Sequence, residues 1–93
     1  MAIARIFECK GWTAADYDAL IDRMDLGGHS APGVLFHVAG PTDEGFRAVD
    51  VYASQEAADA LAVDRVVPAV MELGLTPPDI TQFDVHSTLT PQA

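Results

Sequence analysis

The sequence predicts an α+β fold in which two helices cover one face of an antiparallel four-stranded sheet. Ninety-three residues make one domain, 1–93. Hydrophobic residues are 49% of the chain and charged residues 20%, which is typical of a globular protein. Strand-like and helix-like patterns follow one another in the order βαββαβ, which is the split βαβ or ferredoxin-like arrangement.

The first strand covers residues 2–8, and the first helix begins at Thr13. Asp16 lies three residues further on, which makes a variant of the capping box. Apolar side chains then recur at helical spacing, and the stripe predicted to enter the core is Tyr17, Leu20, Ile21 and Met24. The sequence LGGHSAPG ends this helix because it is rich in glycine and proline.

Residues 34–40 and 46–53 predict a hairpin around the sequence PTDEG, with a turn over 40–45. Ser54 can cap a second helix over 55–73, which ends at Gly74. Pro68 should kink or split this helix near Val66 and Val67, because proline removes a backbone donor. Residues 80–87 predict the last strand, and a tail follows from about residue 88.

Side chains of a strand alternate between the two faces of its sheet. One set in each strand is almost wholly apolar, and we expect it to pack against the helices. The other set is mixed, and we expect it on the face away from the helices, as a cavity or interface beneath a cover. The mixed set is Ile3, Arg5, Phe7, Leu35, His37, Phe46, Asp50, Tyr52, Ile80, Gln82, Asp84 and His86, together with smaller residues.

His37 and Asp50 are the candidate catalytic residues. With a turn over 40–45, Leu35 opposes Asp50 and His37 is its diagonal neighbour. A histidine oriented by a carboxylate can act as a general base. Alternatively, the two form a buried polar pair that completes an interface network. The candidate ligand-binding residues around them are Arg5, Phe7, Leu35, Phe46, Tyr52, Gln82, Asp84 and His86.

Three residues each have two possible roles. Arg5 could hold an anionic or phenolic ligand, or neutralise Asp50 or Asp84. His29 could be a lid residue or an exposed loop residue. Trp12 is predicted to be a packing anchor rather than a cofactor contact.

A metal site is not expected. His37 and His86 with Asp50 or Asp84 have the ligand types of a two-histidine, one-carboxylate iron site. However, these residues lie on separate predicted strands, and no close-spaced ligand motif is present.

The net charge of −9 argues against nucleic acid and anionic membrane as partners, because both need a Lys/Arg-rich face. No signal peptide or membrane span is recognised in the sequence, so a reducing, cytoplasmic location is expected. Cys9 is the single cysteine, which excludes an intrachain disulfide, and it is expected to fill apolar space.

The element order and two stretches of sequence, VDVYASQEAADAL and RVVPAVMELG, carry a family resemblance. A strand ends in the aromatic Tyr52, and Ser54, Glu56 and Ala57 then open a helix as Ser-x-Glu-Ala. This pattern resembles the dimeric α/β-barrel superfamily, especially its antibiotic-biosynthesis-monooxygenase-like branch. The resemblance implies a homodimer in which two sheets stack face to face around a barrel-like cavity.

The resemblance also implies classes of activity. Members include cofactor-independent oxygenases of polyketide aromatics, heme-degrading enzymes and small proteins without known activity. Tyr52 falls where the heme-degrading members carry a cavity tryptophan, and Trp12 is a candidate match to a tryptophan of the quinone-forming oxygenases. Heme-degrading members present an axial histidine from the following helix, whereas residues 55–73 contain none.

Two function classes therefore remain. The first is a small homodimer that binds an aromatic or phenolic ligand and acts as a monooxygenase-like enzyme without a cofactor. The second is a non-catalytic dimer with a binding or structural accessory role.

Overall fold

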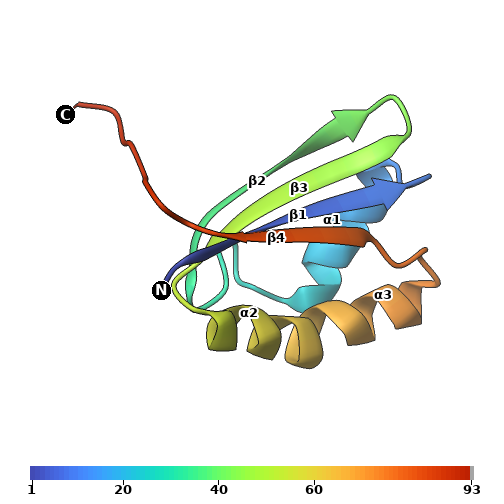
Figure 1. Cartoon of the computed structure of the whole chain (residues 1–93). Helices are drawn as coiled ribbons and strands as arrows, with labels where there is room; N and C mark the ends of the chain where they lie inside the picture. The colour runs from blue at the N-terminus through green and yellow to red at the C-terminus, as the bar shows by residue number, and fades with distance from the viewer. Residues whose placement is uncertain (93) are drawn as a thin grey trace.

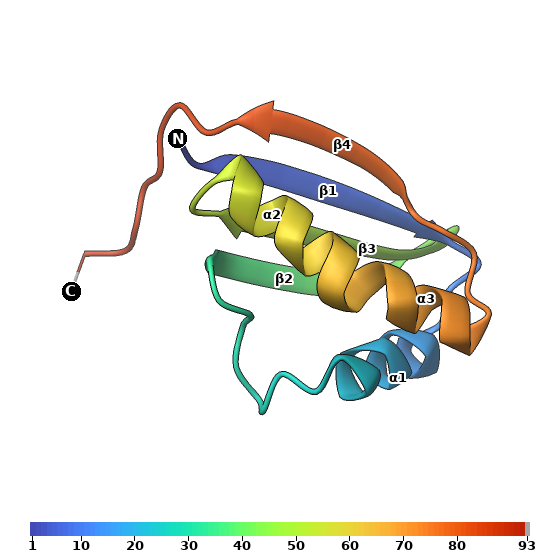
Figure 2. The ribbon, with the colours of Figure 1, turned by 90° about the horizontal axis from the view of Figure 1, so that it is seen from below.

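A computed structural model, which describes residues 1–92, confirms the α+β, ferredoxin-like fold (Figure 1). The strands form one antiparallel sheet in the order β2-β3-β1-β4. The helices lie across a single face of this sheet (Figure 2). The elements are β1 Ile3–Lys10, α1 Ala14–Met24, β2 Val34–Thr42, β3 Gly45–Tyr52, α2 Gln55–Leu61, the π-helical segment η1 Ala62–Val66, α3 Val67–Leu73 and β4 Asp79–Asp84.

The capping box at the start of α1 is confirmed. The backbone N–H of Asp16 donates to the Thr13 hydroxyl at 3.1 Å, and the N–H of Thr13 donates to the Asp16 carboxylate at 2.9 Å. These two bonds fix the first turn and so set which side of α1 faces the sheet. Leu20 and Met24 are buried on that side, as the helical stripe predicted.

The second helix is interrupted where Pro68 requires it. The π-helical segment η1 ends at Val66, and α3 begins at Val67 with Pro68 in its first turn. Proline lacks the N–H that would donate to a carbonyl one turn earlier, and its ring collides with that carbonyl in a regular helix. The wider turn of a π-bulge relieves this collision. The predicted split thus takes the form of a change from π-helix to α-helix at Val66 and Val67, and both residues keep right-handed helical backbone angles.

The hairpin is tighter than the sequence predicted. Thr42 pairs with Gly45, so only Asp43 and Glu44 connect the strands. Pro41 extends β2 instead of opening the turn, which an edge strand tolerates because a missing N–H breaks no ladder there. The expected turn over 40–45 is wrong, and the pairing moves by two residues. A shift of two keeps the side chains from Phe36 onward on their faces. Before Phe36, a register shift in β2 places Val34 on the side of Tyr52.

The prediction that the mixed set lies on the sheet face away from the helices was wrong. The mixed set faces the helices: Phe46, Ala48, Asp50 and Tyr52 of β3 are buried, and Asp50 is only 7% exposed. The apolar set lies on the open face, which we define by Ile6, Phe36, Val38, Val49, Val51 and Phe83. The hand of the strand–helix–strand crossover decides which face the helices cover, and side-chain polarity does not reveal it.

The loop between α1 and β2, residues 25–33, closes over one end of the helix layer. Gly33 adopts a φ of +83°, and a Cβ there would stand 2.6 Å from the Cβ of Ala57 in α2. Only glycine allows this approach in this conformation. The loop is therefore held against α2 at its last residue.

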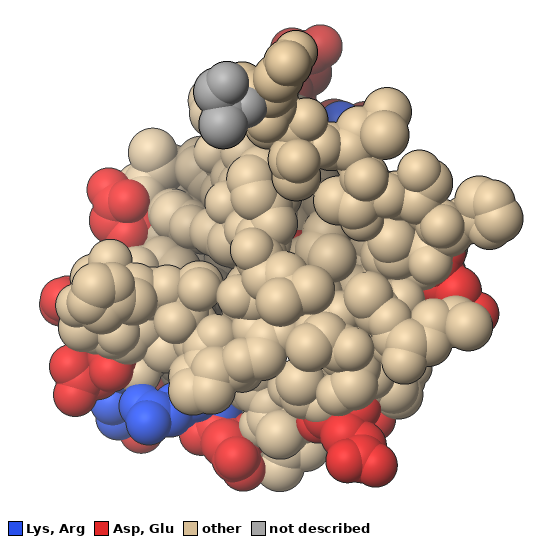
Figure 3. All heavy atoms as spheres, turned by 90° about the vertical axis from the view of Figure 1, so that its left-hand side faces the viewer, with Lys and Arg blue, Asp and Glu red and all other residues tan. Residues whose placement is uncertain are grey.

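Charge is distributed unevenly over the surface. Seen from the side where the C-terminal tail leaves the domain, the surface is uncharged across its centre, and acidic side chains gather near its margin (Figure 3). Among residues 1–92, no helix is both long enough and apolar enough to cross a bilayer.

Candidate functional site

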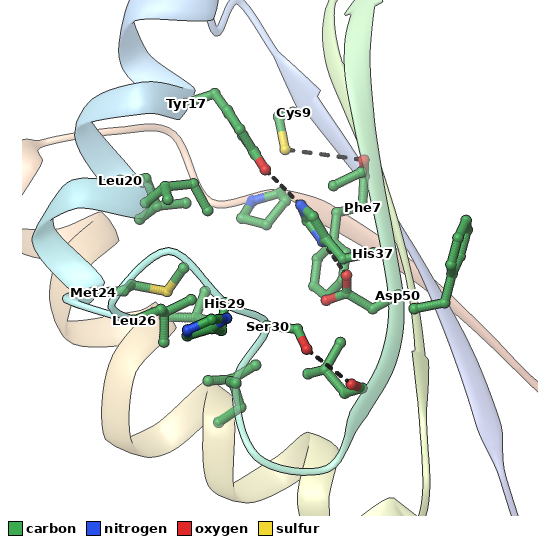
Figure 4. Close-up of a pocket in the computed structure, with 18 of the residues that line it drawn as sticks. Phe7, Cys9, Tyr17, Leu20, Met24, Leu26, His29, Ser30, His37 and Asp50 are labelled. Atoms are coloured by element: carbon green, nitrogen blue, oxygen red, sulfur yellow. Dashed lines mark hydrogen bonds and ion pairs between the residues drawn. The ribbon is translucent and has the colours of Figure 1, made fainter.

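A pocket of about 530 Å³ opens between the sheet and α1, beneath the loop 25–33 (Figure 4). This volume lies within the range of roughly 300–1,000 Å³ that is usual for small-molecule sites. Its wall is mostly apolar and includes Phe7, Trp12, Leu20, Ile21, Met24, Leu26, Val34, Leu61 and Val66. Among the described residues that line it, none is a lysine or arginine.

His37 and Asp50 form a hydrogen-bonded pair at one edge of this pocket. They lie directly opposite each other on β2 and β3, and Nδ1 of His37 bonds to the Asp50 carboxylate. The contact predicted from sequence thus forms by direct pairing rather than along the diagonal. The tight turn between Thr42 and Gly45 sets this alignment, because the pairing is regular from there to His37 and Asp50.

Tyr17 completes the arrangement from the other layer. Its hydroxyl lies 2.5 Å from Nε2 of His37 (Figure 4). Because Nδ1 donates to a carboxylate, Nε2 of the neutral ring is an acceptor and the phenol is the donor. The Tyr17 ring stacks on Phe46, with centroids 4.9 Å apart, so packing also fixes the hydroxyl. Both ring nitrogens of His37 are therefore engaged.

Tyr52 holds the second oxygen of Asp50. Its hydroxyl donates to Oδ2 at 2.6 Å, and its side chain is 2% exposed. With Oδ2 bound to Tyr52, Oδ1 is left facing the imidazole. Four side chains from α1, β2 and β3 thus form one chain, Tyr17–His37–Asp50–Tyr52, which we call the polar chain.

The polar chain shifts the pKa values of its histidine and its two tyrosines in ways that suit acid–base chemistry. The hydrogen bond with Asp50 raises the pKa of His37; burial opposes this effect, and the Asp50 charge adds to it. Burial raises the pKa of Tyr17, and the charges of Asp50 and Asp18 add to this effect. Burial and the bond to Asp50 also raise the pKa of Tyr52. Both tyrosines therefore remain protonated donors, and His37 is the base of the group.

The remaining predicted site residues are dispersed. Phe7 and Leu35 line the pocket, whereas Phe46 and Tyr52 lie behind it as supports for Tyr17 and Asp50. Gln82, Asp84 and His86 are exposed on or after β4 and do not line the pocket.

Arg5 has a different partner from those predicted. Its guanidinium lies 2.9 Å from Asp59 of α2 and also donates to Gln82, and it stacks over the ring of Tyr52. The expected neutralisation of Asp50 or Asp84 by Arg5 is wrong. Arg5 instead ties β1 and β4 to α2 and backs Tyr52 from outside the pocket.

The structure also shows where Trp12, His29 and Cys9 lie relative to the pocket. Trp12 is buried, its indole N–H donates to the Thr76 carbonyl at 2.9 Å, and its side chain also lines the pocket. His29 lines the pocket from the loop and is also exposed to solvent, as one of its two alternatives predicted (Figure 4). Burial raises the pKa of the Cys9 thiol to about 11, and Glu8 adds to this effect, so the thiol is unreactive near neutral pH.

Tyr17 is the functional residue that the sequence analysis placed only in the core. Its position in an apolar helical stripe predicted burial, and nothing in the sequence linked α1 to His37. The only signal was a hydroxyl among aliphatic residues. Among residues 1–92, no three histidine, cysteine or carboxylate side chains come together as a metal cluster would require.

No protein-family model matches the sequence, and no curated protein matches it by sequence comparison. Solved structures do match. The protein NE2512 of unknown function from Nitrosomonas europaea is 22% identical, with a TM-score of 0.68 over 99% of this chain and 94% of that chain. A Chloroflexus aurantiacus protein, provisionally described as an antibiotic biosynthesis monooxygenase, is 20% identical, with a TM-score of 0.67 over 97% of this chain and 98% of that chain.

A third match has a described activity. SnoaB from Streptomyces nogalater, a cofactor-independent oxygenase, is 19% identical, with a TM-score of 0.62 over 97% of this chain and 96% of that chain. The resemblance in fold to antibiotic-biosynthesis-monooxygenase-like proteins is therefore confirmed. At these identities the matches establish the fold, and function must be argued from the site.

Proposed function

We propose that this protein binds an aromatic or phenolic molecule in the pocket beneath α1 and oxygenates it without a cofactor. The observation that carries the proposal is the His37–Asp50 pair at the edge of an apolar pocket. Apolar walls favour a flat, uncharged ring system, and the single polar edge favours a hydroxyl or enol group on one side of it. The fold shared with a cofactor-independent oxygenase supports the same reading.

The reaction begins when His37 removes a proton from the ligand. Asp50 stabilises the imidazolium that forms. The electron-rich carbanion left on the ligand then reduces dioxygen and forms a carbon–oxygen bond, which gives a peroxide. The proton returns from His37 to complete a hydroperoxide. Loss of water breaks the O–O bond and leaves a carbonyl group, so His37 ends in its starting state.

Oxygen uptake tests this proposal. Dithranol, a tricyclic dihydroxyanthrone with an acidic C–H group, is a suitable probe. We expect wild-type protein to accelerate oxygen uptake and quinone formation above the spontaneous rate. His37→Ala should lose about a hundredfold or more of this acceleration, because general base catalysis contributes on that order. If His37→Ala retains the wild-type rate, the proposed role of His37 is wrong.

Asp50→Asn and Asp79→Asn make a matched pair for the same assay. Asp50 is 7% exposed and bonds to His37, whereas the Asp79 side chain is 77% exposed at the start of β4. Both changes remove one negative charge from an acidic protein. Only Asp50→Asn should slow oxygen uptake, and equal effects of the two changes would point to net charge rather than to the pair.

A second copy of the chain covers the open face in this proposal. Phe36, Val38 and Phe83 are 60%, 49% and 52% exposed on that face. A contiguous apolar surface on a small domain marks a protein interface, and the homodimer implied by the family resemblance would bury it. The site itself lies on the helix side, so dimerisation would stabilise the sheet that carries it.

A non-catalytic role is the second candidate, and one observation favours it. The members of the polar chain satisfy one another, and within residues 1–92 no buried side-chain polar atom lacks a hydrogen-bond partner. A satisfied network is also what a purely structural or binding protein would carry. Dithranol binding without faster oxygen uptake would support this alternative.

A further inference from the structure

The proposed function leaves open how a ligand can reach His37. Nδ1 is bonded to Asp50, and Nε2 accepts from Tyr17. No ring nitrogen is free to accept a proton from a bound molecule. Either the ligand must displace Tyr17, or the proton must pass through it.

Packing argues against displacement. The Tyr17 ring lies on Phe46 at 4.9 Å and is nearly parallel to the His37 ring at 6.0 Å, with an interplanar angle of 9°. The same side chain belongs to the helical stripe that packs against the buried core. Moving its hydroxyl away from Nε2 would require the ring to leave both neighbours. Such a movement would sacrifice stacking contacts that favour the observed position.

The Tyr17 hydroxyl is also placed to accept a proton. It lines the pocket together with His37, and it donates its hydrogen to Nε2. A phenol oxygen that donates one bond retains capacity to accept another. Within residues 1–92, His37 Nε2 is the single side-chain partner bonded to this hydroxyl, and it accepts rather than donates. Its free lone pair is therefore available to a ligand in the pocket.

We propose that Tyr17 is the catalytic residue that meets the ligand, and that it relays the ligand proton to His37. This inference rests on the proposed function. The ligand hydroxyl donates its proton to the Tyr17 oxygen as the Tyr17 proton moves to Nε2. One O–H bond breaks on the ligand, one forms on Tyr17, the old Tyr17 O–H bond breaks, and an N–H bond forms on His37. Tyr17 ends neutral and donates to the ligand anion, and the imidazolium is paired with Asp50.

The relay identifies the class of ligand more closely. The lining residues include no lysine or arginine, so the single positive charge that arises beside the ligand is the imidazolium. Asp50 already pairs with this charge, so the site offers no further cation to a ligand that arrives as an anion. The site therefore takes a ligand that enters uncharged and loses one proton, and a ligand that already carries a carboxylate or phosphate would lack a partner.

A nitronaphthol tests the relay because its ionisation is visible in its absorption spectrum and it lacks the acidic CH₂ group that the proposed oxygenation needs. Titration at a pH below the pKa of the free probe measures binding and ionisation separately. We expect wild-type protein to bind the probe and to convert it to the naphtholate. Tyr17→Phe keeps the ring and its stacking but removes the oxygen. It should bind the probe with similar affinity and lose about tenfold or more of its ionisation, because the ligand hydroxyl no longer has a path to Nε2.

The possible outcomes separate the two proposals. Ionisation by Tyr17→Phe equal to or greater than that of wild type would show that Tyr17 only occupies the site of the ligand, and the relay would be overturned while the proposed function stands. No ionisation by wild-type protein would overturn both. Tyr17→Gln is the second variant, to be used if Tyr17→Phe does not fold. The Gln amide can donate to Nε2 of His37 but cannot pass on a proton. This variant should therefore also bind the probe without ionising it. Probe ionisation by this variant at the wild-type level would also overturn the relay.

Discussion

At the scale of single residues, His37 couples stability and activity to pH in opposite directions. The hydrogen bond with Asp50 raises its pKa in the folded protein above the ordinary value of 6.5. The charged pair therefore stabilises the fold fully below that ordinary pKa, and the contribution disappears as pH rises through the raised value. The base, in contrast, must be neutral to accept a proton, so activity rises over the same interval.

The opposite pH dependences of stability and activity can be measured with His37→Gln as the reference protein. From about pH 5 to about pH 8, the free energy of unfolding of wild-type protein should fall relative to that of the variant. Over the same range the oxygen uptake of wild-type protein with dithranol should rise. Urea denaturation at each pH gives the first quantity and an oxygen electrode the second. A constant stability difference between the two proteins across this range would contradict a raised pKa for His37.

Sequence reasoning located His37 and Asp50 because a histidine and a carboxylate stand out in an apolar hairpin. It did not locate Tyr17 as their partner. A tyrosine in a helical stripe satisfies the apolar period, so the pattern hides its hydroxyl. Sequence reasoning also assigned ligand-binding roles to residues of β4, whose polar side chains Gln82 and Asp84 are exposed in the structure. Alternation along a strand gives the face of a residue but not its distance from a pocket.

At the scale of elements, the ends and caps of the helices followed from local chemistry. The register of the hairpin and the sheet face that the helices cover did not. Thr13, Pro68 and Gly74 act through bonds to their own neighbours, and each has its predicted effect. The hairpin register depends on whether Pro41 belongs to the strand or the turn, and local sequence permits both. The covered face depends on the hand of a crossover between β1 and β2, which no local pattern contains.

Gly33 links the loop over the pocket to α2, and its replacement should loosen that link. Gly33→Ala places a methyl group 2.6 Å from the Ala57 Cβ at a φ of +83°. Gly28→Ala is the matched control, because Gly28 has a φ of +81° with nothing within 4 Å. We expect the control to cost about 1–2 kcal/mol of unfolding free energy from backbone strain. Gly33→Ala should cost about 1–3 kcal/mol more, from overpacking. Equal losses in chemical denaturation would mean that the loop is not packed on α2.

At the scale of the whole molecule, the fold distributes its polar and apolar residues unusually. The helix-covered side carries the polar chain inside the core, and the open face carries apolar side chains. This inversion is why polarity misled the face prediction. Burying a satisfied network beneath α1 leaves the apolar face for another surface, and a second copy of the chain is the simplest partner.

A charge on the open face should separate the copies. Val38 is 49% exposed on β2, and Val63 is 70% exposed on η1, away from the open face. In sedimentation at matched concentration, wild-type protein and Val63→Glu should be dimers, and Val38→Glu should shift to monomers because it would bury an unpaired carboxylate. A monomeric wild-type protein, or the same response from both variants, would exclude the open face as the dimer interface.

In the proposed reaction, the polar chain ionises a bound phenolic or enolic ligand before oxygen takes part. The most direct measurement is the absorption spectrum of dithranol mixed with the protein in the absence of oxygen. We predict the spectrum of the bound enolate with wild-type protein and of the neutral molecule with His37→Ala. Bound dithranol that stays neutral with wild-type protein, or that ionises equally with both proteins, would contradict the claim.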